Sequence, residues 1–117
     1  MRNIILGVVT PLALLFGAAV NAAPFRALAS WYGPGFYGNL TANGEVYTGN
    51  QYTTAHPSLP FGTRVRVTKP RTGATIVVRV NDRGPFIGPR QFDLSRAAAQ
   101  AIGLIHSGVA NLQFEIL

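Results

Sequence analysis

Acidic side chains are scarce in this sequence, and two of the four lie next to turn signals. Glu45 directly follows Asn43-Gly44, a dipeptide typical of tight turns, so its side chain is expected to project from a loop. Asp82 follows an apolar alternation over residues 76–80, and a strand end can direct a carboxyl group into a groove. Two carboxyl groups that share a site can donate and accept protons, so this pair predicts general acid–base chemistry.

A histidine is the third candidate for chemistry. His56 precedes Pro57 and can hydrogen-bond a carboxylate or a substrate hydroxyl. Each of the three candidates also has a purely structural interpretation. Asp82 could cap a turn through backbone bonds, Glu45 could be an exposed loop acid, and His56 could be a hydrogen-bonded structural histidine. Only their occurrence together favours a catalytic role.

The other polar residues are expected to have structural roles. Asp93 and Ser95 are predicted to serve the start of a helix, where capping oxygens and negative charge are favourable. Glu115 alternates with apolar residues, so it is expected on the solvent face of a last strand. The sequence predicts no cofactor and no metal site, because it has no cysteine and its two histidines lack the spacing of a chelate.

The elements that must position these residues are mostly short strands. Apolar residues alternate with polar ones over residues 27–32, 64–68, 75–80 and 112–117, and turn-forming residues separate these segments. One helix is predicted over residues 96–102, with Ser95 as its N-cap and Gly103 as its stop. A shorter helical turn is predicted over residues 52–55, before Pro57. This pattern indicates a small, mainly β barrel or sandwich.

The first residues have the pattern of a secretory signal. Arg2 precedes an apolar run over residues 4–20, and small residues follow, which predicts a signal peptide over 1–22 and a domain over 23–117. A retained membrane anchor is the alternative, but the run is short for a bilayer. The domain is therefore expected to be exported to the periplasm or secreted, soluble after cleavage. Without a cysteine it is expected to carry neither a disulfide nor a lipid anchor.

The net charge bears on the partners of the protein. The sequence carries a formal charge of +6, and all but one of its basic residues are arginine. Arginine makes fork-like contacts to carboxylates and phosphates, so an anionic envelope polymer is a plausible partner. Nucleic acid is not expected, since an exported chain without a nucleic-acid-reading motif has no means of recognising it.

Four motifs occur in a fixed order along the chain. They are Ala29-Ser30-Trp31-Tyr32-Gly33 with Thr41-Ala42-Asn43-Gly44-Glu45, residues 54–63, Val80-Asn81-Asp82-Arg83-Gly84-Pro85-Phe86, and Asp93-Leu94-Ser95. In this order they resemble a known family, the double-psi β-barrel of rare lipoprotein A proteins, which are septal lytic transglycosylases. The similarity spans residues 27–117 and extends more distantly to expansins and barwin-like proteins. It implies a six-stranded double-psi β-barrel with one or two short helices.

The resemblance implies an activity and a set of site residues. The substrate would be the glycan strands of peptidoglycan, cleaved between N-acetylmuramic acid and N-acetylglucosamine without water. The family's acidic and histidine positions fall on the catalytic candidates, Glu45, His56 and Asp82. An Asp that some relatives carry three residues after the Glu is Thr48 here. The residues expected to bind substrate are Tyr32, Tyr37, Asn43, Asn81 and Arg83, with the tyrosine rings packing against sugar faces.

Two other functions stay open at this point. One is a non-catalytic, expansin-like module that binds or loosens cell-wall glycan, which the missing acid at Thr48 favours. The other is a protein that only scaffolds division-site partners. The expected form in either case is a monomer, and the pair of carboxyls with His56 favours the enzyme.

Overall fold

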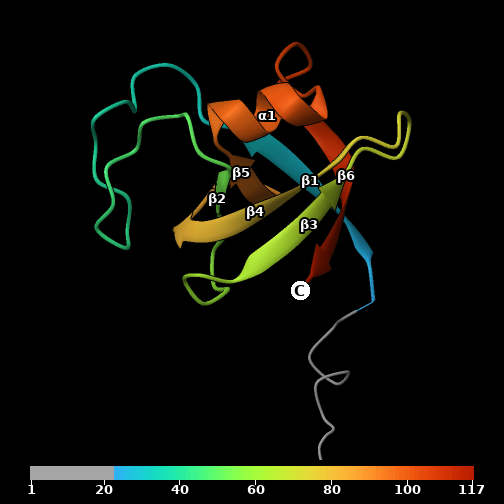
Figure 1. Cartoon of the computed structure of the whole chain (residues 1–117), viewed down its shortest axis with the longest axis horizontal. Coiled ribbons are helices and arrows are strands. Elements are labelled where there is room, and N and C mark those ends of the chain that lie inside the picture. Colours follow the sequence, from blue (N-terminus) through green and yellow to red (C-terminus); the bar gives the residue numbers. More distant parts are fainter. Residues whose placement is uncertain (1–22) are drawn as a thin grey trace, which may run out of the picture.

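The computed structural model describes residues 23–117, so the signal peptide predicted over residues 1–22 lies outside it. Six strands and one helix make up the described chain (Figure 1). None of the helices in this part of the chain is both long and apolar enough to cross a membrane. In chain order the elements are β1 (Phe25–Trp31), β2 (Thr53–Ala55), β3 (Arg64–Thr68), β4 (Thr75–Asp82), β5 (Arg90–Leu94), α1 (Arg96–Ile102) and β6 (Val109–Ile116).

The six strands close into a barrel in the order β1-β5-β2-β4-β3-β6, with β6 pairing back onto β1. The β1–β5 and β2–β4 pairs are parallel, and the other four pairs are antiparallel. Closure pairs the edge of every strand, which suits a small domain that has no disulfide. The predicted six-stranded barrel is therefore confirmed, with a single short helix.

The barrel interior follows from the period-two pattern of the strands. In β3 and β4 the side chains of Val65, Val67, Val78 and Val80 are buried, while the arginines between them face outward. Phe92 of β5 and Phe114 of β6 fill the centre, with their rings stacked at a centroid distance of 3.9 Å. Glu115 lies on the outer face, as predicted, where it accepts a hydrogen bond from Arg66.

The helix occupies the predicted residues and packs on the barrel. Ser95 is its N-cap, and the Ser95 hydroxyl accepts a hydrogen bond from the backbone N–H of Ala98. Gly103 ends the helix in the left-handed conformation, at φ 77°, which a residue with a side chain rarely adopts. The residues that α1 buries are Ala98, Ala99 and Ile102.

Two segments depart from the sequence-based expectation. The helical turn predicted over residues 52–55 is wrong, because residues 53–55 form the strand β2 between β4 and β5. All three side chains of β2 are buried, and tertiary pairing outweighs the local preference of so short a segment. Strand β5 was not predicted at all, although Phe92 and Leu94 do alternate with polar residues.

The long connection between β1 and β2 projects from the barrel on the side where β4 ends (Figure 1). It contains a small antiparallel bridge between Leu40 and Val46, with the Asn43-Gly44 turn between them. The backbone N–H of Asn43 donates to the carbonyl of Asn81 on β4. This bond fixes the Glu45 segment against the carboxyl end of β4, where Asp82 lies.

Candidate active site

Asp82 lies at the carboxyl end of β4, and three donors fix its carboxylate. Its Oδ1 accepts hydrogen bonds from the backbone N–H groups of Ala42, at 2.8 Å, and Arg83, at 2.9 Å. Its Oδ2 accepts a short hydrogen bond from the hydroxyl of Tyr32. The carboxyl group is only partly buried, so it is held in one orientation while a substrate can still reach it.

Tyr32 is buried, so its ring is not placed to stack on a sugar as predicted. Its side chain is only 6% exposed, and its ring stacks on that of Tyr47 at a centroid distance of 4.6 Å. Burial, and then the hydrogen bond to Asp82, raise the pKa of Tyr32 well above its ordinary value. The phenol therefore stays protonated and donates to Asp82, so Tyr32 positions the carboxylate instead of packing on a sugar.

Glu45 is held by a guanidinium that the sequence-based prediction did not include. Arg79 donates to both carboxylate oxygens, through its two terminal nitrogens at 2.6 and 2.8 Å. Asn81 and Asn43 each donate one further bond, at 3.1 and 2.9 Å. The hydrogen bonds from Arg79, Asn81 and Asn43 lower the pKa of Glu45 to about 2. Glu45 is therefore ionised near neutral pH and is an unsuitable proton donor.

Replacing Arg79 by Met is expected to raise the pKa of Glu45 toward its ordinary value of 4.5. The folded-state pKa is depressed, so the pair stabilises the fold above pH 4.5, and this contribution is lost as the pH falls toward 2. The wild type should therefore lose stability more steeply over this range than Arg79→Met. A carboxyl NMR titration and urea unfolding at several pH values measure both effects. Arg66→Met breaks the other ion pair and should leave the Glu45 pKa unchanged.

The structure gives positioning roles to three residues that were predicted to bind substrate. Asn81 is only 4% exposed, and its amide is directed at Glu45. Asn43 also serves Glu45, because its Oδ1 accepts from the Glu45 backbone N–H and its Nδ2 donates to the carboxylate. The Arg83 guanidinium donates to the carbonyls of His56 and Leu59 and lies 4.0 Å over the ring of Phe61. These contacts fix the segment that follows β2.

His56 follows β2, and its orientation is set by the backbone. Its Nδ1 accepts hydrogen bonds from the N–H groups of Ser58 and Leu59, at 3.1 and 3.0 Å, so the ring proton resides on Nε2. Burial, and then the charge of Arg83, lower the pKa of His56. The backbone N–H of His56 donates to the Asp82 carbonyl. The structure thus joins the backbones of His56 and Asp82, while the imidazole, neutral near pH 7, packs against the ring of Phe92 at a centroid distance of 4.8 Å.

Of the two tyrosines predicted to pack on sugar rings, Tyr37 is the accessible one. Its side chain is 49% exposed, and its ring packs on Tyr47 at a centroid distance of 5.6 Å. The Tyr37 ring also lies over Gly49, where an added Cβ would be 2.5 Å from Cε1. Phe36 is exposed next to it in sequence. Phe36 packs edge-on against Tyr32, the donor to Asp82, so these two exposed rings can offer apolar faces to sugars beside the site.

Asp93 is a site residue that the sequence-based interpretation placed wrongly at the helix start. Its carboxylate instead accepts a hydrogen bond from the hydroxyl of Ser30 on β1. In the sheet, Asp93 of β5 and Asp82 of β4 pair with the same residue of β2, Ala55. Burial raises the pKa of Asp93, and the charge of Asp82 adds to this increase. A third carboxyl, besides those of Asp82 and Glu45, therefore lies at the site, on the opposite side of β2 from Asp82.

This arrangement can carry out proton transfer at a bound polar substrate. Asp82 is accessible and oriented, Glu45 is a fixed negative charge, and His56 is a neutral donor through Nε2. Glu45 and Asp82 are not joined by a hydrogen bond in the described chain, and each has its own set of donors. Across residues 23–117 no three acidic or histidine side chains are grouped so as to hold a metal ion.

Comparisons with known families and curated proteins agree on one kind of relative. Residues 25–114 match the family model described as lytic transglycolase. The chain is 59% identical over 103 residues to a probable endolytic peptidoglycan transglycosylase RlpA of Synechocystis sp., covering 87% of this chain and 32% of that protein. It is 49% identical over 90 residues to the endolytic peptidoglycan transglycosylase RlpA of Campylobacter jejuni, covering 77% and 33%. The chain thus spans about a third of the length of these relatives.

Solved structures share the fold at low sequence identity. The Streptomyces papain inhibitor superposes with a TM-score of 0.65 at 22% identity, covering 84% of this chain and 97% of the inhibitor. The apo expansin of Clavibacter michiganensis superposes with a TM-score of 0.63 at 24% identity, covering 81% of this chain and 50% of the expansin. These two neighbours establish the barrel architecture and carry no information about the reaction.

Proposed function

The chain belongs to the lytic transglycolase family of RlpA-like double-psi β-barrels, and from this membership we propose that it is an endolytic peptidoglycan lytic transglycosylase. The bond cleaved is the glycosidic bond between N-acetylmuramic acid and N-acetylglucosamine, and the product carries a 1,6-anhydro end. The relatives that share 49–59% identity are named for an activity on peptidoglycan, which supports this substrate.

The setting of Asp82 is the observation that carries the proposal. The partly buried Asp82 carboxyl is held by the Tyr32 hydroxyl and by the backbone N–H groups of Ala42 and Arg83 at the end of β4. The negative charge of Glu45 is held nearby, because Asn81, the residue before Asp82 on β4, donates to the Glu45 carboxylate. A cation-like sugar transition state needs both a proton donor and negative charge, and this arrangement supports both requirements.

The reaction can be completed with one carboxyl that acts twice. Asp82 first gives its proton to the glycosidic oxygen, and the bond from this oxygen to the muramic acid C1 breaks. The 6-hydroxyl oxygen of the same muramic acid then bonds to C1, and its proton passes to Asp82. No water enters, so a second carboxyl that activates water is not required. Glu45 stabilises the positive charge on the sugar, and His56 orients the glycan strand through its Nε2–H.

The other groups of the site have supporting roles in this proposal. Tyr37, with Phe36 beside it, offers exposed rings on which sugar units pack. Thr48, at the place where some relatives have an acid, uses its hydroxyl to accept a bond from the backbone N–H of Asn50. The fixed charge near the reacting sugar is therefore supplied by Glu45. Action on the wall requires export, which agrees with the signal peptide predicted outside the described residues.

The products formed from purified peptidoglycan test the proposal. Incubation with the wild-type protein is expected to release glycan fragments that end in 1,6-anhydro-muramic acid, because attack is intramolecular. Mass spectrometry distinguishes these from the reducing ends of hydrolysis by the mass of one water. Reducing ends would make the protein a hydrolase and refute the proposal. Binding to glycan without any cleavage would instead favour the non-catalytic, expansin-like module.

A further inference from the structure

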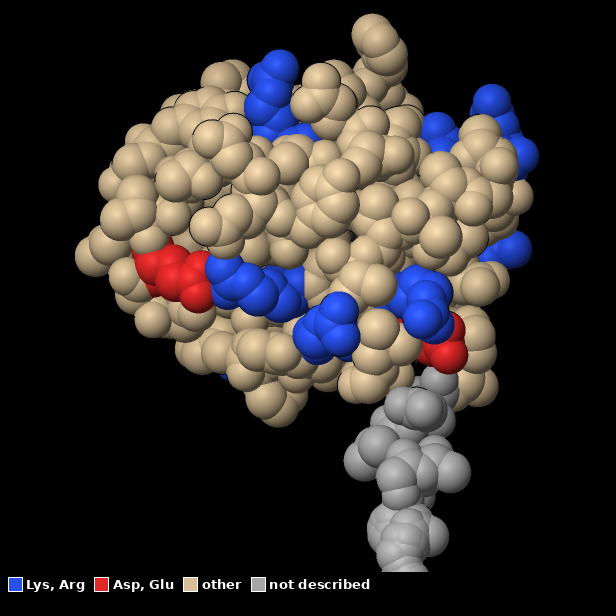
Figure 2. Space-filling view, viewed as in Figure 1, with Lys and Arg blue, Asp and Glu red and all other residues tan. Residues whose placement is uncertain are grey.

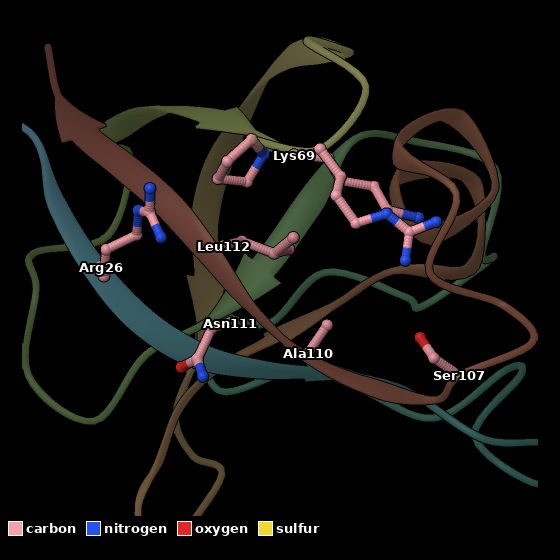
Figure 3. Close-up of a pocket in the computed structure, with 8 residues that line it drawn as sticks. Arg26, Lys69, Ser107, Ala110, Asn111 and Leu112 are labelled. Atoms are coloured by element: carbon pink, nitrogen blue, oxygen red, sulfur yellow. The ribbon is translucent and has the colours of Figure 1, made fainter.

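A cavity opens in the barrel wall at the opposite end of β4 from Asp82 (Figure 3). Its volume is about 290 Å³. Its walls are Arg26 of β1, the turn residues Lys69, Pro70 and Arg71 between β3 and β4, and residues 107 and 110–112 in and before β6. The eight residues of β4 separate this turn from Asp82, which is roughly 25 Å of extended chain, so the cavity is not part of the candidate active site.

The cavity follows from an unequal pairing of strands. The ladder between β3 and β6 ends at the Thr68–Gln113 pair, whereas β6 pairs with β1 as far as Val109. The first residues of β6 therefore have a neighbouring strand on only one side. The chain leaves β3 at Lys69 and turns over this opening, and Figure 3 shows Arg26 and Lys69 on opposite sides of β6.

Three cations meet at this opening without an acidic partner. All four acids of the sequence are elsewhere, because Glu45 and Glu115 pair with Arg79 and Arg66, while Asp82 and Asp93 lie in the candidate active site. In Figure 2 the acids in view lie against basic side chains. The basic side chains at the upper right, where Figure 1 places the β3–β4 turn, have no acidic neighbour in view. Mutual repulsion of these cations would be relieved by a bound anion.

The lining also offers defined donors. The Lys69 ammonium is fixed by donating to the carbonyl of Gly103, at 2.8 Å, and it has two further N–H donors. Arg26 and Arg71 are exposed at the rim and can each present a guanidinium fork. Asn111 and Ser107 supply an amide and a hydroxyl. Such a set of donors suits an oxyanion, whose several oxygens can accept from all of them.

We propose that this cavity is a second binding site, which takes an oxyanion, a phosphate or a carboxylate, carried by a cell-envelope polymer. The site does not depend on glycan cleavage at Asp82. Binding here would hold the protein to an anionic polymer while the other end of the barrel remains free to act. The interaction should weaken with salt, because exposed charges are screened over roughly 8 Å at physiological ionic strength.

Titration of the purified protein with inorganic phosphate, at constant ionic strength, tests this site by NMR. The backbone amides of Ser107 and Asn111 are expected to shift saturably, while those near Asp82 stay unchanged. The double variant Arg26→Ala/Arg71→Ala should bind phosphate at least about tenfold more weakly, since two charge-assisted contacts are lost. The double variant Arg64→Ala/Arg96→Ala removes the same charge from exposed positions outside the cavity and should bind as the wild type does.

Parallel titrations with glycerol phosphate and acetate identify the anionic group that the site prefers. If the polymer binds through phosphate groups, glycerol phosphate should bind more tightly, and if it binds through the carboxylates of peptide stems, acetate should. Saturable binding of either anion that is lost only in Arg26→Ala/Arg71→Ala supports the site. Shifts that never saturate, or an equal loss in both double variants, would show general attraction to a basic surface and overturn it. Neither result depends on whether the protein cleaves peptidoglycan.

Discussion

Asp82→Asn is expected to slow peptidoglycan cleavage by about 10²–10⁴-fold, which is the contribution typical of a lost general acid–base group. An Asn has nearly the shape of an Asp, so its Oδ1 can still accept from the N–H groups of Ala42 and Arg83. It has no titratable proton to give to the leaving oxygen. Glycan binding should persist, since an amide still hydrogen-bonds sugar hydroxyls. Rates of anhydro-product release and co-sedimentation with peptidoglycan measure the two effects separately.

Two matched variants separate proton transfer from positioning. Tyr32→Phe removes the hydroxyl that donates to Asp82 but keeps the ring stacked on Tyr47, so it should cost less activity than Asp82→Asn. Glu45→Gln removes a charge that Arg79 keeps ionised, so it should slow the reaction without changing which group donates the proton. Full activity in Asp82→Asn would show that the acid lies elsewhere, and Asp93 would then be the next carboxyl to replace.

The sequence indicated which segments form the candidate site, but not the hydrogen bonds within it. Glu45, His56 and Asp82 were predicted from their turn-rich motifs and from the family resemblance, and the structure gathers their segments at one end of β4. The ion pair of Glu45 with Arg79 spans 34 positions, so no local pattern reveals it. The sequence did contain one indication of this ion pair, because the alternation of β4 puts Arg79 on the same face as Asn81.

The buried tyrosines show a second limit. Tyr32 lies beside glycines, which suggested an exposed ring, but the loop between β1 and β2 folds Tyr47 over it. The interior of that loop depends on contacts such as the Tyr47 hydroxyl accepting the N–H of Arg96, 49 positions away. Burial in a long loop is therefore set by tertiary packing, which period-two patterns describe only within strands.

The strand predictions differ in success for the same reason. Residues 64–68 and the helix over residues 96–102 were predicted with the observed bounds, because valine alternation and the helix caps are local signals. The three residues of β2 are too few for any period to be visible, and only pairing with β4 and β5 makes them a strand. Short central strands of a closed barrel are thus specified by their neighbours.

Phe92→Ala is expected to lower the free energy of unfolding by about 3–5 kcal/mol, the cost typical of truncating a buried Phe. Phe92 is completely buried and stacks on Phe114 at a centroid distance of 3.9 Å. It also packs against Phe25 and His56, at centroid distances of 6.4 and 4.8 Å. The closed barrel restricts how far its strands can move inward, so the cavity left by the ring should not collapse. Urea unfolding followed by tryptophan fluorescence measures this loss.

Phe86→Ala is the matched control, because the same atoms are removed from a side chain that is 77% exposed. Its effect on stability should stay within about 0.5 kcal/mol. The free energy of unfolding of a small domain is roughly 5–15 kcal/mol, so the loss expected from Phe92→Ala can leave that variant unfolded at 25 °C. In that case Phe92→Leu provides a smaller loss of stability that can be measured. Equal losses at positions 86 and 92 would contradict the central place of Phe92 in the core. Because Phe92 supports the His56 ring, Phe92→Leu should also alter the His56 titration, whereas Phe86→Ala should not.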